Sequence, residues 1–255
     1  MRAEKNIGGK PVRKLYEKSE LAFSLVWIGL YCVLMSVGDA LSEKAGVSKS
    51  VTLPAAFILS VFLLFFVKRN GFSERYGLCK PRCTSKEMLY YIPLVIMLLA
   101  NLMYGVKINL SPAETVLYVL TMLLVGFLEE LIFRGLLFKA MAENGVKAAV
   151  AVSSITFGMG HIINLLNGSG AKLIPNLLQV VYAMAAGFMF VMIFLKSGSI
   201  LPCILGHGVF NALSAFADEV ALSETDRIIS CVFLVAVCGG YGAYLAYDIK
   251  KKKCT

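Results

Sequence analysis

The sequence predicts an all-α integral membrane protein, a polytopic bundle of about eight transmembrane helices with both termini in the cytoplasm. Three observations predict this fold. The 255 residues are 58% hydrophobic and only 16% charged, with a mean hydropathy of +0.75, which is far too apolar for an ordinary soluble domain. Apolar runs near the length of about 20 residues that a helix needs to cross a membrane recur along the chain. The basic residues gather on one of the two sides that this topology creates.

Eight apolar runs are separated by polar or charged breaks, and each is expected to form one transmembrane helix. They cover residues 21–40, 51–67, 88–105, 112–142, 147–166, 175–196, 198–217 and 226–248. The first run follows a basic stretch, but it is longer than the core of a usual signal peptide, so we interpret it as an anchor. Residues 84–87 and 111–114 have capping-box spacing, Pro112 suits a first helical position, and Asn144-Gly145 has the composition of a helix stop.

Lysine and arginine residues support the orientation. Of the 25, 20 fall at the N-terminus, in the loop 68–87, around the turn between the fourth and fifth runs, at the end of the sixth run and in the C-terminal tail. The positive-inside rule therefore places both termini in the cytoplasm. The same distribution accounts for the net charge of +9 without a nucleic-acid partner, and a basic rim can attract anionic membrane lipid. We expect a multi-pass protein of a bacterial plasma membrane.

The chain is expected to form one transmembrane helical domain over residues 21–248, with a catalytic core at about residues 114–216. A basic cytoplasmic segment, residues 1–20, precedes this domain, and a basic tail, residues 249–255, follows it. The seven cysteines are irregularly spaced and lie mostly in apolar runs, so no disulfide framework is expected. Cys79 and Cys83 have no histidine nearby, so we expect no metal clip there.

Ionisable side chains inside apolar runs mark the candidate site, because each costs at least a few kcal/mol on membrane insertion. Glu129 and Glu130 lie in the fourth run, and the chain's two histidines, His161 and His207, lie in the fifth and seventh. Consecutive helical residues are about 100° apart, so the two glutamates are not expected to face the same point. We expect Glu130 to pair with Arg134, four residues later, which leaves Glu129 free to point into a cavity.

Two further features of the helices surround these residues. His207 and Asn211 are four residues apart and should project from the same helical face. Small residues near the site let helices approach closely or leave room for a substrate backbone. They are Gly158, Gly160, Gly206 and Gly208.

A carboxylate and an imidazole in an apolar cavity are suited to activating water, while a second histidine with an asparagine can supply donors to an oxyanion. Together these groups can hydrolyse an amide. Covalent catalysis by Ser153, Ser154 or Cys203 is a second choice, because none is spaced to form an obvious nucleophile with a histidine.

A metal is a further possibility at the same residues. Glu129, His161 and His207 make the three-ligand set of a catalytic site for a divalent metal such as zinc. They are scattered over three helices, and the same side chains can serve without a metal.

Three short motifs lie in order on separate apolar runs: Glu129-Glu130-Leu-Ile-Phe-Arg134, Phe157-Gly-Met-Gly-His161 and His207-Gly-Val-Phe-Asn211. They resemble the motifs of the CPBP family, which includes the Rce1-like CAAX prenyl proteases and the bacterial Abi proteins. The resemblance covers about residues 114–216, and every motif position is filled.

The resemblance implies a role for each motif residue. Glu129 and His161 would activate water, His207 and Asn211 would stabilise the tetrahedral intermediate, and Glu130 would support them with Arg134. It also implies an intramembrane endopeptidase that acts in the cytoplasmic half of the membrane on a membrane-associated peptide. The substrate would be a lipidated peptide in eukaryotic relatives, whereas bacterial relatives are linked to bacteriocin maturation or self-immunity.

Two other functions fit parts of the pattern. A non-catalytic immunity or scaffold protein could bind a peptide in the same cavity, although the filled motif positions favour an enzyme. A proton-coupled transporter could use the glutamates and histidines as a relay, but the sequence has no inverted repeat or paired broken helices. Cleavage of a substrate separates the protease from both.

Overall fold

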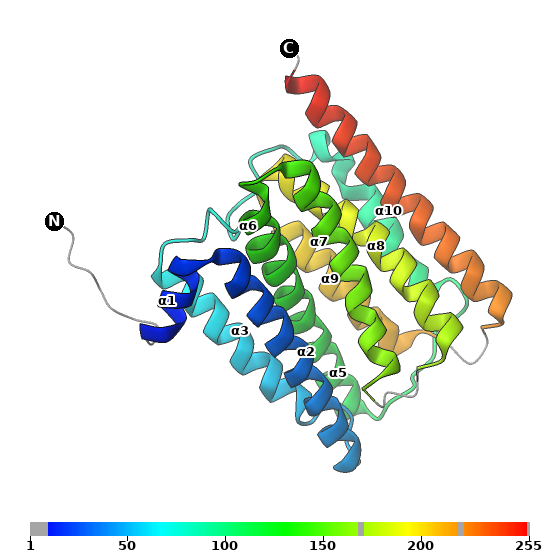
Figure 1. Ribbon diagram of the computed structural model, residues 1–255. Helices are drawn as coiled ribbons and strands as arrows, with labels where there is room; N and C mark the ends of the chain where they lie inside the picture. The colour runs from blue at the N-terminus through cyan, green and yellow to red at the C-terminus, as the bar shows by residue number, and fades with distance from the viewer. Residues whose placement is uncertain (1–9, 168–170, 219–221, 254–255) are drawn as a thin grey trace.

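The computed structural model describes residues 10–167, 171–218 and 222–253, which form a bundle of helices (Figure 1). The α-helices are α1 (Lys10–Lys18), α2 (Glu20–Lys44), α3 (Thr52–Arg69), α4 (Ile92–Leu99), α5 (Pro112–Glu129), α6 (Phe138–Ala142), α7 (Val146–Gly160), α8 (Leu173–Ser197), α9 (Leu201–Leu213) and α10 (Glu224–Lys253). The 3-10 segments are η1 (Lys86–Tyr91), η2 (Ala100–Leu102), η4 (His161–Leu165) and η5 (Ser214–Phe216), and η3 (Glu130–Leu137) is a π-helix. Strand pairing among the described residues is limited to one isolated bridge, between Val106 and Ala217. The predicted all-α bundle is confirmed.

Six helices are long and apolar enough to cross a membrane. They are α2, α3, the continuous helix Pro112–Ala142 formed by α5, η3 and α6, the helix Val146–Leu165 formed by α7 and η4, α8, and α10. Each corresponds to one of the expected spans. The remaining two expected spans, 88–105 and 198–217, contain the shorter helices α4 and α9.

The expected span at 88–105 is shorter because a turn interrupts it. Residues 89–91 have φ angles of 49°, 52° and 57°, which are left-handed and incompatible with a right-handed α-helix. Thr84 and Glu87 form the reciprocal hydrogen bonds of the predicted capping box, yet the α-helix begins only at Ile92. The expected span at 198–217 is shortened in a similar way, because left-handed Gly198 ends α8 and α9 begins only at Leu201.

Other local predictions are confirmed. Ser111 and Glu114 form a capping box at the start of α5, with Pro112 in the first turn. Gly145, with a φ of +146°, separates α6 from α7. The basic N-terminal segment contains a feature that was not expected, the short helix α1, and Ser19 then caps α2.

The helix Pro112–Ala142 lies at the centre of the bundle and positions the candidate site. Its α5 portion packs against α3 and α9, while η3 contacts α2 and α7. On the other side, α8 packs between α7 and α10 (Figure 1). Large apolar side chains point outward, including Ile58, which is 67% exposed, and Val232, which is 62% exposed. Such an apolar exterior is expected of helices that face lipid.

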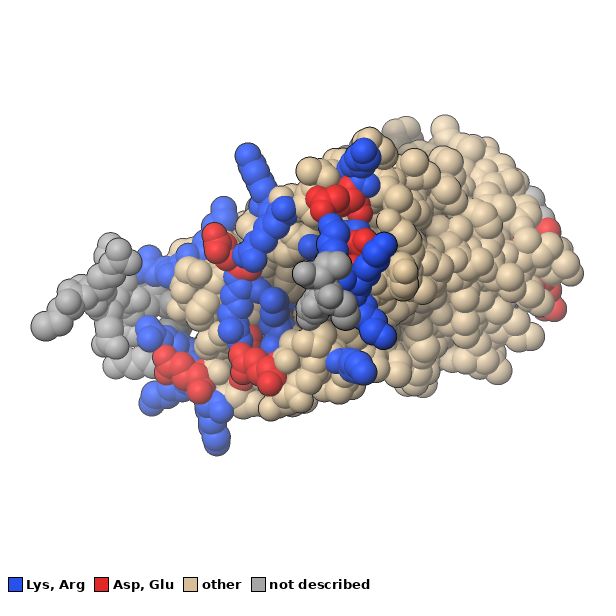
Figure 2. Space-filling view, turned by 90° about the horizontal axis from the view of Figure 1, so that it is seen from above, with Lys and Arg blue, Asp and Glu red and all other residues tan. Residues whose placement is uncertain are grey.

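One end of the bundle is strongly basic. Figure 2, which looks down on the molecule of Figure 1, shows Lys and Arg side chains gathered there. We call this the basic end; it comprises α1, the loop 70–85, the turn between α6 and α7, and the C-terminal ends of α3, α8 and α10. Both terminal helices reach it, as the predicted topology requires. The other end, with the N-terminal ends of α5, α8 and α10, is called the opposite end.

Six of the seven cysteines lie in the described residues, where all are free thiols and none links two elements. Cys254 lies outside the described residues.

Candidate active site

His207, in the middle of α9, lies between the two intramembrane glutamates. Its Nδ1 is 2.9 Å from Glu130 Oε1, and its Nε2 is 3.4 Å from Glu129 Oε2. The two glutamates point in different directions, as expected, and contact different edges of the ring. Glu129 was expected to be free to point into a cavity, but it contacts Tyr31 and His207 and is not among the residues that line the pocket described below. An imidazole has nitrogen atoms on two edges, so one inserted ring can contact two carboxylates that point in different directions.

Arg134 completes the support for Glu130, as predicted. Its Nη1 lies 3.0 Å from Glu130 Oε1, and both side chains are fully buried. The guanidinium lies 4.0 Å from the ring centre of Phe157 and 5.3 Å from that of Phe190. The same two rings contact His207, Phe157 edge-on at 5.4 Å and Phe190 stacked at 5.5 Å. The aromatic rings therefore fix the cation and the imidazole on either side of Glu130.

Glu129 receives a hydrogen bond that sequence reasoning missed. The hydroxyl of Tyr31, a buried residue of α2, donates to Glu129 Oε1 at 2.7 Å. The second oxygen, Oε2, is buried and has no hydrogen-bond partner among the described residues. Tyr31 is one of 11 tyrosines and belongs to none of the three motifs. The sequence feature that could have identified Tyr31 is a tyrosine inside an apolar span, because a buried phenol hydroxyl usually has a hydrogen-bond partner.

The backbone at the two glutamates is unusual. The α-helical hydrogen-bond pattern of α5 ends at Glu129, and the following eight residues, Glu130–Leu137, are π-helical. A π-helical turn is wider than an α-helical turn, and such insertions are frequent at functional sites. The change in helical pitch therefore begins at the carboxylates that contact His207.

Close packing of α5 on α9 brings these carboxylates to the imidazole. A Cβ atom on Gly126 would lie 2.5 Å from the Cα of Gly208, so the two backbones touch without intervening side chains. Two other glycines that the sequence singled out, Gly158 and Gly206, also face close contacts. Gly160 faces open space, so it does not serve helix packing.

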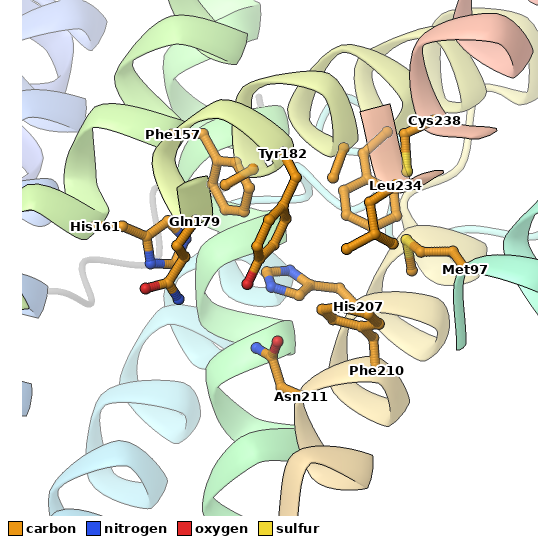
Figure 3. A pocket seen from close by; sticks show the side chains of 13 residues that line it. Met97, Phe157, His161, Gln179, Tyr182, His207, Phe210, Asn211, Leu234 and Cys238 are labelled. Carbon is orange, nitrogen blue, oxygen red and sulfur yellow. The ribbon is translucent and has the colours of Figure 1, made fainter. Parts of the chain in front are cut away.

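His161 and Asn211 line the same small pocket as His207 (Figure 3). The pocket has a volume of about 40 Å³, which is enough for water. The Asn211 side-chain amide has no hydrogen-bond partner among the described residues, so its donors are available to a bound group. No direct hydrogen bond joins His161 to Glu129 within the described part of the chain, so the expected cooperation of these two residues requires a water between them.

The three alternative nucleophiles are engaged elsewhere. The Ser153 hydroxyl donates to the Phe133 carbonyl at 2.9 Å, and the Ser154 hydroxyl donates to the Val150 carbonyl at 2.7 Å. The Cys203 thiol faces the carbonyl of Phe190 at 3.5 Å. None of the three hydrogen-bonds to a histidine ring in the described residues, which favours water as the nucleophile.

The arrangement does not fit the predicted metal set. No group of three His, Cys, Asp or Glu side chains in the described ranges is placed to hold a metal ion. A metal held by Glu129, His161 and His207 stays a prediction, and the chemistry proposed below uses the side chains themselves.

A comparison with protein-family models found a match to the part of the chain that contains the site. Residues 111–213 match the Rce1-like model, described as type II CAAX prenyl endopeptidase Rce1-like. This part of the chain is similar to the Rce1-like family. The Rce1-like domain runs from the N-cap of α5 to the end of α9, so it holds every predicted site residue but not Tyr31. It indicates an intramembrane protease of the CAAX type. No curated protein matches the chain.

Proposed function

We propose that the protein is an intramembrane endopeptidase that hydrolyses a membrane-associated peptide with an activated water molecule. One observation carries this proposal: Glu129 is held at one oxygen by Tyr31, while its free oxygen faces His207, which lines a pocket of water size. A carboxylate with one fixed and one free oxygen is prepared to accept a proton in a defined direction.

Water activation is assigned to Glu129 and His161. A water molecule in the pocket can hydrogen-bond to His161 and His207, which line it, and the proposed acceptor of its proton is Glu129, whose Oε2 lies 3.4 Å from His207 Nε2. The buried hydrogen bond from Tyr31 keeps the carboxylate from rotating away.

Oxyanion stabilisation is assigned to His207 and Asn211. Glu130 is paired with Arg134 and therefore acts as a hydrogen-bond acceptor. The His207 nitrogen that faces Glu130 is Nδ1, so Nδ1 carries a proton. When the ring is protonated, Nε2 also carries a proton that it can donate. Asn211, one turn further along α9, offers a second donor from the same pocket.

The proposed reaction balances without an added reagent. The water oxygen bonds to the peptide carbonyl carbon as one water proton moves to Glu129, and the carbonyl oxygen becomes the oxyanion. The carbon–nitrogen bond then breaks, and Glu129 returns its proton to the departing nitrogen. The products are a carboxyl group and an amine, and the glutamate is again a carboxylate.

The proposed substrate is a peptide held at the membrane, with or without a lipid group. The long apolar helices and the family make the protein a multi-pass membrane protein. We propose the bacterial plasma membrane as its location, because the basic end gives the expected asymmetry of charge.

The test compares purified full-length variants in detergent on quenched fluorescent peptides, including prenylated and leader-peptide types. Wild type is expected to cleave at least one peptide, and Glu129→Gln to lose that cleavage. Glu43→Ala, which removes an exposed carboxylate of α2, is the matched control and should keep it. Undiminished cleavage by Glu129→Gln would contradict the proposal, and a wild type that binds a peptide without cleaving it would favour a scaffold.

A further inference from the structure

A second, larger cavity lies at the opposite end of the bundle. It has a volume of about 870 Å³, within the 300–1,000 Å³ typical of ligand sites. Its walls come from the first turns of α8 and α10, from η2 and from the chain that follows α9. The N-terminal ends of α8 and α10 lie away from the basic end, where both helices finish (Figure 1).

This cavity adjoins the catalytic pocket. Four residues line both spaces: Gln179, Tyr182, Phe210 and Leu234. The rings of Tyr182 and Phe210 are 6.4 Å apart and edge to face, and they stand beside His207 and Asn211 (Figure 3). The two spaces therefore meet at an aromatic pair directly next to the catalytic groups.

The basic end is closed, although it is nearer to the catalytic groups. Phe190, which stacks on His207, lies about 10 Å from the end of α8 at Ser197 and about 26 Å from its start at Leu173, at 1.5 Å per residue. The short path is filled by side chains that are at most 3% exposed, Tyr76, Phe138, Phe194 and Ile200. The loop 70–85 is fixed across this end, where the backbone N–H of Ile200 donates to the Gly77 carbonyl at 2.9 Å.

The lining of the large cavity indicates what it binds. Polar side chains such as Asn101, Gln179 and Ser230 stand beside apolar ones such as Leu173 and Leu178. A peptide, which carries both a polar backbone and side chains, suits such a mixed lining, whereas a lipid acyl chain offers nothing to the polar groups.

We propose that the peptide substrate enters through this cavity from the membrane side opposite the basic end, as an extended segment. The proposal rests on the proposed protease function. An extended chain advances at most about 3.3–3.6 Å per residue, so about eight residues span the 26 Å from the start of α8 to the site. The substrate would then present an unfolded stretch of that length on the side away from the protein's own termini.

Thiol labelling tests the route without relying on activity. The variant Ser230→Cys places a thiol in the cavity, and Lys80→Cys places one on the exposed basic loop. Right-side-out and inverted membrane vesicles are treated with a membrane-impermeant quaternary-ammonium methanethiosulfonate, and the modified residue is identified by peptide mass spectrometry. Position 230 is expected to react from the face opposite to that of position 80. Reaction of both positions from the same face would overturn the proposal.

A second arm links the route to catalysis. The peptide that wild type cleaves fastest is offered to both labelled variants in detergent, where membrane sidedness no longer matters. The label at position 230 is expected to raise KM at least tenfold, while the label at position 80 leaves it unchanged. Unchanged cleavage after complete labelling at position 230 would overturn substrate entry here. If wild type cleaves no peptide, the proposed function fails, and the labelling pattern still shows whether the cavity opens on the predicted face.

Discussion

The approach of α5 to α9 makes a quantitative prediction at Gly126. In the variant Gly126→Ala, the new Cβ would lie 2.5 Å from the backbone of Gly208, whereas ordinary van der Waals contact begins at 3.4 Å. The obstruction is backbone, so no flexible side chain can move aside. The two helices must separate by about 1 Å, and the separation occurs three residues from Glu129 and directly beside His207.

The expected effects differ in size for activity and for stability. A displacement of about 1 Å between catalytic groups can reduce the rate by about 100-fold, so kcat should fall on that order. Overpacking of this kind typically costs about 1–3 kcal/mol, so the unfolding temperature in detergent should also fall. Both are measured on purified protein, cleavage with the best quenched peptide and unfolding by a thermal scan. The control is Gly29→Ala, because a Cβ there meets nothing within 4 Å.

Two results would refute this reasoning. If Gly126→Ala cleaves at the wild-type rate while folded, the contact of α5 with α9 does not set the distance between Glu129 and His207. If Gly29→Ala loses as much activity as Gly126→Ala, the loss reflects any added methyl group in a membrane helix rather than the backbone contact.

Three further predictions concern other parts of the molecule. Tyr31→Phe removes a hydrogen bond to the carboxylate of Glu129, so kcat should fall at least about tenfold with KM unchanged. The control Tyr247→Phe changes an exposed tyrosine and should keep full activity. Equal kcat values for the two variants would remove Tyr31 from the mechanism. Chelation of divalent metals should leave cleavage at its full rate, and a loss that zinc restores would show that a metal takes part. Lys252 and the capping contacts lower the pKa of Glu87 from 4.5 to about 2, so their contribution to stability is complete above pH 4.5 and is lost as pH falls toward 2. The unfolding temperature of wild type should therefore drop more across that range than that of Glu87→Gln, and parallel curves would contradict this.

Hydropathy predicted the helices that are long and continuous, but it could not predict where the backbone turns. An average over about 20 residues is insensitive to the sign of φ, so residues 89–91 looked like part of a span although they are left-handed. The shortening of α9 had the same origin, because the turn at Gly198 lies within an apolar run. Local polar motifs predicted helix boundaries more exactly than hydropathy did, as the capping box at Ser111 shows.

Within the site, the predictable contacts were those along a single helix. The pair of Glu130 with Arg134 follows from their spacing of four residues. The hydrogen bond from Tyr31 to Glu129 joins residues 98 positions apart, and no local pattern encodes it. The imidazole of His207 between two carboxylates depends on the crossing of α5 and α9, which only tertiary packing determines.

The charges in the buried site favour catalysis over a packing role. Two carboxylates and one guanidinium leave one negative charge uncompensated in a poor dielectric, unless His207 or Glu129 carries one further proton. The gap of 3.4 Å between His207 Nε2 and Glu129 Oε2 places that proton between the two groups. A structural core would be more stable without the second carboxylate and its unpartnered oxygen. A hydrolase, in contrast, needs a group that accepts a proton from water and returns it to the departing amine, and this is the role proposed for Glu129 beside His207.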